Sequence, residues 1–373
     1  MVKEYTLITR TPLWTGDILG RSERARETSI IGSLRWWYEA IVRGLGGYAC
    51  DPSQGNKCEW DPKLEKKSVC PACYLFGATG WARLFSLRIG ELGTVPVFFR
   101  HLSYANNSWM NLIFKKQLGS QRALWGRTIL TLIDRGVETA YALRQAEMVL
   151  MFTTLFGGIG ARTQHGFGQI LLDPMVEYDA PIFSDTIREL KAHIGKGVFK
   201  HGRNPPNAPD LKRFVFLLEI VNTSNRIVRQ YLNTEPFPQE VQNSKVNLLE
   251  YLPCAFELRY DAKTDHTLPI IGFRRWIKER AQARWSQFEL VNLLGRTGKR
   301  IPDDERQGSH LSFAMPFKVA PDQYAFKVFG FSPKNKTGQL KVDLKAYMDS
   351  LLGVSSNCWS GDAWLNKHLG GNP

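Results

Sequence analysis

Residues 138–172 read ETAYALRQAEMVLMFTTLFGGIGARTQHGFGQILL. The part up to Phe156 has the length and apolar content of a long helix, and Gly157 and Gly158 follow it as a stop signal. Residues 169–172 are short and largely apolar, as a strand would be. The stretch therefore predicts a helix that leads through a glycine-rich loop into a strand.

The preceding residues extend this pattern toward the start of the chain. Residues 5–9 are β-branched and aromatic and predict a strand. Apolar residues recur every three or four positions over 29–45, which predicts an amphipathic helix. Residues 84–89 and 127–133 predict two further strands. The resulting order β-α-β-β-α-β favours an antiparallel sheet with both helices on one face and the other face free for a ligand.

The second half of the chain has a less regular pattern. Residues 195–212 are rich in Gly and Pro and predict a linker or mobile loop. The further expected elements are strands at 214–221, 255–260, 311–319 and 324–331 and helices at 273–294 and 340–352. A second α+β domain fits these elements, although their pattern does not define its topology. We expect a first domain at 1–180, a linker at 181–212 and a second domain at 213–373.

The charge balance favours a polyanionic partner. The chain has 49 Lys and Arg residues against 35 Asp and Glu residues, a formal net charge of +14. Phosphate contacts by Lys and Arg release condensed counterions, so such a surplus suits nucleic acid, although a generically basic protein is the alternative. We find neither a basic segment followed by an apolar one at the start nor an uncharged stretch of membrane-spanning length. We therefore expect a cytoplasmic protein with no membrane partner.

The glycine-rich loop at 157–169 is the first candidate for ligand binding. Nucleotide hydrolysis is disfavoured because the loop follows a helix, enters a strand and lacks the Lys-Ser/Thr pair of a phosphate-binding loop. Its glycines allow backbone N–H groups to approach a ligand closely, and the residues between them offer polar contacts. A purely structural turn is the alternative.

Two other segments carry positive charge beside aromatic residues. A basic loop runs into the start of the helix at 29–45, where unpaired N–H groups suit a phosphate and Trp14 offers a stacking surface. The alternatives are that Ser29 only caps this helix and that the tryptophans, including at least one of Trp36 and Trp37, are core residues. Residues 100–127 interleave basic and aromatic side chains, and a solvated hairpin is the competing interpretation. The predicted RNA-contacting residues are Trp14, Arg21, Arg24, Arg26, Ser29, Gly32, Arg35, Lys115, Lys116, Gly158, Gly160, Arg162, Thr163, Gln164, His165 and Gly166.

Four cysteines lie within one loop: Cys50, Cys58, Cys70 and Cys73. The last two form a Cys-x-x-Cys turn, and four thiolates complete a tetrahedral zinc site that would order a loop with little core of its own. Four free thiols are the alternative. We therefore predict a structural zinc ion as the only cofactor.

The sequence contains no catalytic constellation. The histidines show no paired spacing, and no Gly-x-Ser-x-Gly segment is present. We therefore expect a binding protein and no enzyme. The alternatives are a metal-independent endoribonuclease that uses His165 or His101 as general acid–base, and a scaffold whose positive charge meets acidic subunits.

Three segments resemble a known family. Residues 11–16 together with 29–40, residues 70–77 (Cys-Pro-Ala-Cys-Tyr-Leu-Phe-Gly) and residues 158–168 resemble RAMP (repeat-associated mysterious protein) sequences, and among them the first Cmr subunit of type III-B CRISPR systems. Glu27 departs from the pattern, because a basic residue and Pro are expected in the loop before Ser29.

The resemblance implies an α+β chain of two tandem ferredoxin-like domains. It also implies a place at the end of a ribonucleoprotein that acts in antiviral defence, with contacts to other Cmr subunits of the RAMP type and to guide or target RNA. Target cleavage belongs to a different subunit of such complexes. We thus expect a non-catalytic, single-strand RNA-binding subunit.

Overall fold

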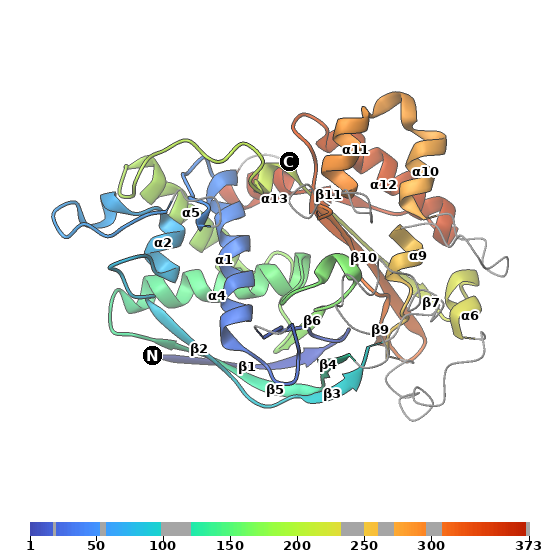
Figure 1. Cartoon of the computed structure of the whole chain (residues 1–373), viewed down its shortest axis with the longest axis horizontal. Coiled ribbons are helices and arrows are strands. Elements are labelled where there is room, and N and C mark those ends of the chain that lie inside the picture. Colours follow the sequence, from blue (N-terminus) through green and yellow to red (C-terminus); the bar gives the residue numbers. More distant parts are fainter. Residues whose placement is uncertain are drawn as a thin grey trace.

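The computed structural model describes residues 1–17, 20–52, 57–97, 121–232, 250–259, 272–295 and 308–370. Two antiparallel sheets and their helices form the two halves of the molecule (Figure 1). The chain is thus a mixed α/β protein, as predicted.

The first sheet contains β1 (Val2–Thr9), β2 (Phe85–Ile89), β5 (Arg127–Asp134) and β6 (Ile170–Asp173) in the order β2-β5-β1-β6. All neighbouring strands are antiparallel. Helix α1 (Glu27–Gly44) follows β1, and α4 (Thr139–Phe156) follows β5. The predicted β-α-β-β-α-β elements are confirmed, each within three residues of its expected ends. A small hairpin of β3 (Gly93–Pro96) and β4 (Arg122–Trp125) is inserted between β2 and β5.

The two faces of this sheet differ in burial. Along β1, Tyr5 and Leu7 are buried, whereas the intervening Thr6 and Ile8 are only partly buried. Ile129, which pairs with Thr6 on the neighbouring strand, is 49% exposed. Because successive side chains of a strand point to opposite faces, the helices cover one face and the other stays open in the described part of the chain.

The second sheet contains β7 (Phe214–Asn222), β8 (Leu311–Phe313), β10 (Gln323–Phe331) and β11 (Cys358–Ser360) in the order β11-β7-β10-β8, and β9 (Phe317–Ala320) pairs with β10. Helix α12 (Thr337–Leu352) connects β10 to β11, as α4 connects β5 to β6. With β9 left aside, the four remaining strands of the second sheet and the four strands of the first both lie in the order last, first, third, second along the chain. The chain between β7 and β8 also forms α6 (Arg226–Leu232), and α13 (Gly361–Leu369) follows β11.

Three expectations for the second half are wrong in detail. Residues 255–260, predicted as a strand, instead contain helix α9 (Ala255–Arg259), because Leu258 packs into the core of this half. The single helix predicted at 273–294 is broken into α10 (Phe273–Arg280), a 3-10 turn η7 (Gln282–Arg284) and α11 (Gln287–Leu294). Ser286 starts α11 through a capping box with Glu289. The strand predicted at 311–319 is divided into β8 and β9, with Pro316 between them.

The segment between the two sheets packs against the first half. Helix α5 (Pro181–Gly195) lies within the segment expected to be a linker and buries Phe183, Ile187 and Leu190 in the first core. Further along, the Asn204 side chain donates to the Gly47 carbonyl, and the turn η6 (Leu211–Arg213) contributes Leu211 to the same core.

The two halves share a continuous apolar interface. Phe214, Phe216, Phe329 and Phe331 project from the second sheet into the core formed by α1 and α4, where they surround the ring of Trp37 and its neighbours. The helices of the first half thus lie between the two sheets. Across the described residues, every helix is too short or too polar to span a bilayer.

Candidate nucleic-acid interface

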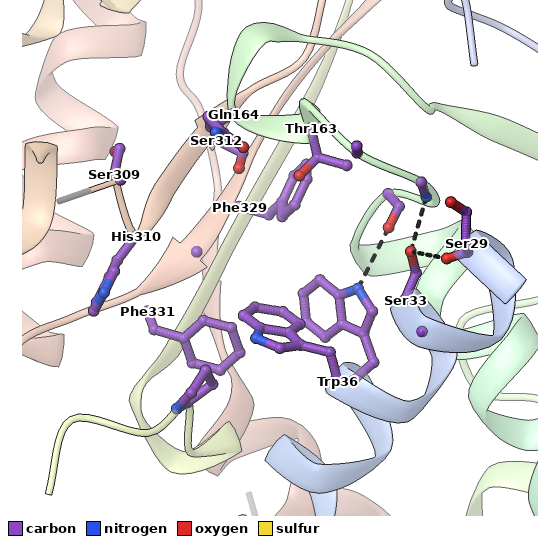
Figure 2. A pocket seen from close by; sticks show the side chains of 18 residues that line it. Ser29, Ser33, Trp36, Thr163, Gln164, Ser309, His310, Ser312, Phe329 and Phe331 are labelled. Atoms are coloured by element: carbon purple, nitrogen blue, oxygen red, sulfur yellow. Dashed lines mark hydrogen bonds between the residues drawn. The ribbon is translucent and has the colours of Figure 1, made fainter. Parts of the chain in front are cut away.

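A pocket of about 600 Å³ lies between the two halves. Figure 2 shows its walls, which come from the first turns of α1, from the glycine-rich loop and from β8 and β10. The lining residues include Ser29, Gly32, Ser33, Trp36, Gly158, Gly160, Thr163, Gln164, Ser309, His310, Ser312 and Phe331. Segments far apart in the sequence therefore meet at one concave surface.

Backbone N–H groups of the glycine-rich loop bond to α1 and to Trp14, which precedes α1. The Gly160 N–H donates to Ser33 Oγ (2.9 Å), and the Ala161 N–H donates to the Trp14 carbonyl (2.8 Å). Gly160 has a φ of +85°, and a Cβ atom there would lie 2.5 Å from the Trp14 carbonyl oxygen. Only glycine suits this position, because a side chain meets both an unfavourable backbone conformation and a backbone atom.

The second half of the chain holds the far end of the loop. Arg259 donates through Nη1 to the Gln164 carbonyl (2.8 Å), and the Met315 N–H donates to the Gly166 carbonyl (3.3 Å). A Cβ atom on Gly166 would lie 2.6 Å from Ala255. Gly166 is thus enclosed between the halves, and its predicted contact with RNA is replaced by a structural role.

Six of the predicted RNA-contacting residues line this pocket: Ser29, Gly32, Gly158, Gly160, Thr163 and Gln164. The two expected binding segments, the start of α1 and the glycine-rich loop, therefore form one surface. Within the described ranges, the side chains of Thr163 and Gln164 make no hydrogen bond, so their polar atoms are available to a ligand.

Trp14 does not offer the stacking surface expected from the sequence. Its side chain is 1% exposed, and the guanidinium of Arg162 lies 4.5 Å from the centre of its ring. The edge of Phe167 packs against the same tryptophan. A buried ring covered in this way has no face for a base, so Trp14 belongs to the support of the loop.

The predicted basic loop before α1 lies at the surface. Arg21 and Arg24 are exposed, and Arg26 is partly buried. Arg21 lies 3.9 Å from Glu23, and Arg26 lies 3.8 Å from Asp17. An exposed pair such as Arg21–Glu23 contributes little to stability. Lys115 and Lys116 lie outside the described residues.

The candidate general acid–base His165 is buried and uncharged. Burial lowers its pKa well below the usual value, and the positive charges of Arg259 and Arg162 lower it further. The lowered pKa disfavours the imidazolium form that a general acid needs, and burial keeps the ring away from an RNA strand. The other candidate, His101, lies outside the described residues.

The four loop cysteines form a compact cluster. The Sγ atoms of Cys50, Cys58, Cys70 and Cys73 all lie within 4.8 Å of one another, and all four residues are buried. The Cys50–Cys73 and Cys50–Cys70 sulfur distances are 3.3 and 3.9 Å. A tetrahedral site with zinc–sulfur bonds of about 2.3 Å has sulfur–sulfur edges of about 3.8 Å. The four cysteines can therefore hold a metal ion.

Local structure positions these thiols. The turn η2 (Glu65–Ser68) leads to Cys70, whose Sγ caps helix α2 (Pro71–Phe76) by accepting from the Cys73 N–H. Arg35 of α1 donates through Nη2 to Cys73 Sγ (3.1 Å) and through Nη1 to the Gly77 carbonyl (3.0 Å). The predicted phosphate contact of Arg35 is thus replaced by a contact with the cluster, because its guanidinium is already paired there.

One family model and several solved structures are similar to this chain. Residues 6–171 match the RAMP superfamily. The chain is also similar to Cmr1 from Pyrococcus furiosus in its apo form, with 16% identity over 97% of this chain and 99% of that chain and a TM-score of 0.47. A chain of the type III-B Cmr-beta complex bound to cognate target RNA is similar at 13% identity over 92% of this chain and 98% of that chain, with a TM-score of 0.44. No curated protein matches.

The RAMP match ends within β6, before the second half begins. Ser309, His310, Ser312 and Phe331 of the pocket wall lie beyond it, and sequence reasoning missed them because they belong to no motif. Trp36 was missed as a pocket residue too, although the adjacent Trp36 and Trp37 of an amphipathic helix cannot both face its core. Trp37 is 2% exposed and Trp36 is 42% exposed.

Proposed function

We propose that this chain is a non-catalytic subunit of a cytoplasmic Cmr-type ribonucleoprotein in antiviral defence, and that it binds single-stranded guide or target RNA at the pocket between its halves. The observation that carries the proposal is that the start of α1 and the RAMP glycine-rich loop line one pocket of about 600 Å³. The net charge of +14 supports a polyanionic ligand.

The strand order supports a tandem arrangement. With β9 left aside, both sheets have the order last, first, third, second, which is the order of a ferredoxin-like β-α-β-β-α-β unit. We propose that the chain contains two such units, with the second one completing the binding surface of the first. Other Cmr subunits of the RAMP type are the proposed neighbours.

Structural zinc is the proposed occupant of the cysteine cluster. Four thiolates fill all four positions of a tetrahedral zinc ion and leave none open for a substrate, so the ion would order the loop at 50–73 and perform no chemistry. The buried, neutral state of His165 also argues against the endoribonuclease alternative.

A binding titration with the purified full chain tests the proposed function. We expect single-stranded RNA to bind more tightly than duplex RNA of equal length, with affinity falling steeply as salt is added. A variant carrying both Thr163→Ala and Gln164→Ala should bind several-fold more weakly. The matched control carries Ser350→Ala and Asn366→Ala, two exposed polar positions on α12 and α13 that do not line the pocket.

Two outcomes would contradict the proposal. A log–log plot of affinity against salt with a slope near zero would exclude phosphate recognition. If the pocket double variant and the control double variant bind RNA with equal affinity, the pocket is not part of the RNA-binding surface.

A further inference from the structure

An exposed tryptophan lies at the wall of the pocket. Trp36 is 42% exposed, while its neighbour in sequence, Trp37, is 2% exposed and packs in the core. Ligand pockets are lined mainly by apolar and aromatic side chains. Figure 2 shows Trp36 among the lining side chains, between α1 and the strands of the second half.

The neighbours of Trp36 leave its ring without a stacked partner. Trp37 lies 5.0 Å away at an interplanar angle of 89°, and Phe331 lies 5.4 Å away at 84°. Both contacts are perpendicular, and among the described residues no ring lies parallel to Trp36. The two neighbours therefore hold the indole in place while a planar group can still stack on it.

Polar residues from the other walls line the same pocket. Gln164 comes from the glycine-rich loop, His310 directly precedes β8 of the second sheet, and Ser312 lies within β8. Their side chains make no hydrogen bond within the described ranges. Burial, together with the positive charge of Arg213, lowers the pKa of His310, so its neutral imidazole offers one donor and one acceptor.

A planar group with donors and acceptors along its edge satisfies both features. Nucleobases have this chemistry, and unstacked bases of single-stranded RNA are commonly bound by an aromatic ring and by hydrogen bonds to their edges. The volume of about 600 Å³ falls in the range of sites that enclose a small planar ligand together with the sugar and phosphate attached to it.

We infer that the pocket holds one unstacked nucleobase, which lies on the ring of Trp36 and presents its edge to Gln164, His310 and Ser312. This inference rests on the proposed RNA-binding function and assigns the base to a particular ring. The second half of the chain would then contribute directly to RNA recognition. The base comes from an RNA strand, and a free mononucleotide is the other source that the experiment distinguishes.

The experiment compares three variants of the full chain: Trp36→Ala, Trp36→Phe and, as a matched control, Trp359→Ala. Trp359 is 46% exposed, close to the value of Trp36, and does not line this pocket. Each variant is titrated with a single-stranded RNA and with an abasic strand of the same length. A nucleoside monophosphate is titrated in a third series, and the thermal midpoint of each variant is recorded.

We expect Trp36→Ala to weaken binding of the base-bearing RNA on the order of tenfold and to leave the abasic strand unaffected, because stacking is lost and phosphate contacts remain. Trp36→Phe should recover most of the affinity because phenylalanine also stacks. Trp359→Ala should bind like the wild type. The nucleoside monophosphate alone should bind far more weakly than RNA.

The contrary outcomes separate the inference from the proposed function. If the wild type prefers RNA to duplex but Trp36→Ala and Trp359→Ala bind equally well, the assignment of the base to Trp36 fails and the RNA-binding function stands. If the mononucleotide binds as tightly as RNA, the pocket is a free-nucleotide site and the inference fails. If no strand binds to the wild type, the proposed function itself fails.

Discussion

The Nζ atom of Lys327 donates a hydrogen bond to the carbonyl oxygen of Gly157 at 2.7 Å. Lys327 lies in β10 of the second half, and Gly157 is the residue at which α4 ends and the glycine-rich loop begins. The same ammonium group reaches the Thr154 carbonyl at 3.3 Å. The last carbonyls of a helix lack partners within it, and the Lys327 side chain supplies hydrogen bonds at this end of α4. The start of the binding loop is therefore tied to the other half of the chain.

The burial of Lys327 predicts a pH dependence of stability. Burial lowers the pKa of Lys327 to about 7, whereas an unfolded lysine titrates near about 10.4. Between these values the unfolded chain holds more protons than the folded chain, so the free energy of unfolding should rise with pH from about 7 to about 10. The expected rise is roughly 2–4 kcal/mol. Below pH 7 Lys327 is protonated in both states and its contribution is constant.

Chemical denaturation at several pH values measures this rise. Other groups titrate in the same window, so the comparison is with Lys327→Met, which keeps the length of the side chain and removes the charge. The variant should lack the part of the slope due to Lys327. Identical slopes in the two proteins would contradict a lowered pKa of this residue.

The cysteine cluster predicts that metal content and stability are lost together. Cys70→Ser removes one candidate ligand, while a serine hydroxyl still caps α2. We expect zinc to fall from about one ion per chain to near zero and the free energy of unfolding to fall by several kcal/mol. Elemental analysis and denaturation of protein purified without chelators provide the measurements.

Cys358→Ser is the matched control for this experiment. Cys358 is also buried, but it lies in β11 and does not belong to the cluster. The Cys358→Ser variant should retain as much zinc as the wild type. If wild-type protein purified without chelators contains no zinc, the predicted metal site is wrong and the four cysteines are free thiols.

Replacing Gly32 by alanine should have opposite effects on the stability of the fold and on RNA affinity. Gly32 lies in α1 and lines the pocket, and a Cβ atom there would meet nothing within 4 Å. Gly32→Ala should therefore stabilise the helix by about 0.5–1 kcal/mol, because alanine loses less backbone entropy on folding. RNA binding should weaken if the strand passes close to this turn. A raised thermal midpoint with unchanged RNA affinity would remove Gly32 from the interface.

At Gly160, in contrast to Gly32, replacement by alanine should destabilise the fold. Gly160→Ala places a side chain at φ +85° and a Cβ atom 2.5 Å from the Trp14 carbonyl oxygen. We expect a loss of about 2 kcal/mol or more in the free energy of unfolding. The control Gly338→Ala lies in α12 with open space around it and should be neutral or stabilising. Equal thermal midpoints of the two variants would contradict the structural role of Gly160.

The sequence by itself determined the elements of the first half and the cluster of cysteines. The period of apolar residues in α1 and the glycines after α4 are local signals, and the Cys-x-x-Cys turn at Cys70 and Cys73 is a local half-site. Local signals are legible because each one depends on neighbours within a few residues.

Only the tertiary structure decided which residues of these segments face a ligand. The sequence predicted Trp14 as the stacking residue and considered Trp36 only as a possible core residue, yet packing buries Trp14 under Arg162 and leaves Trp36 at the pocket wall. His310, which directly precedes β8, joins the site from a segment far along the chain from the glycine-rich loop, and only long-range packing brings the two together. Burial and partner choice are properties of the whole fold, and the sequence pattern of one segment carries no information about the segment that covers it.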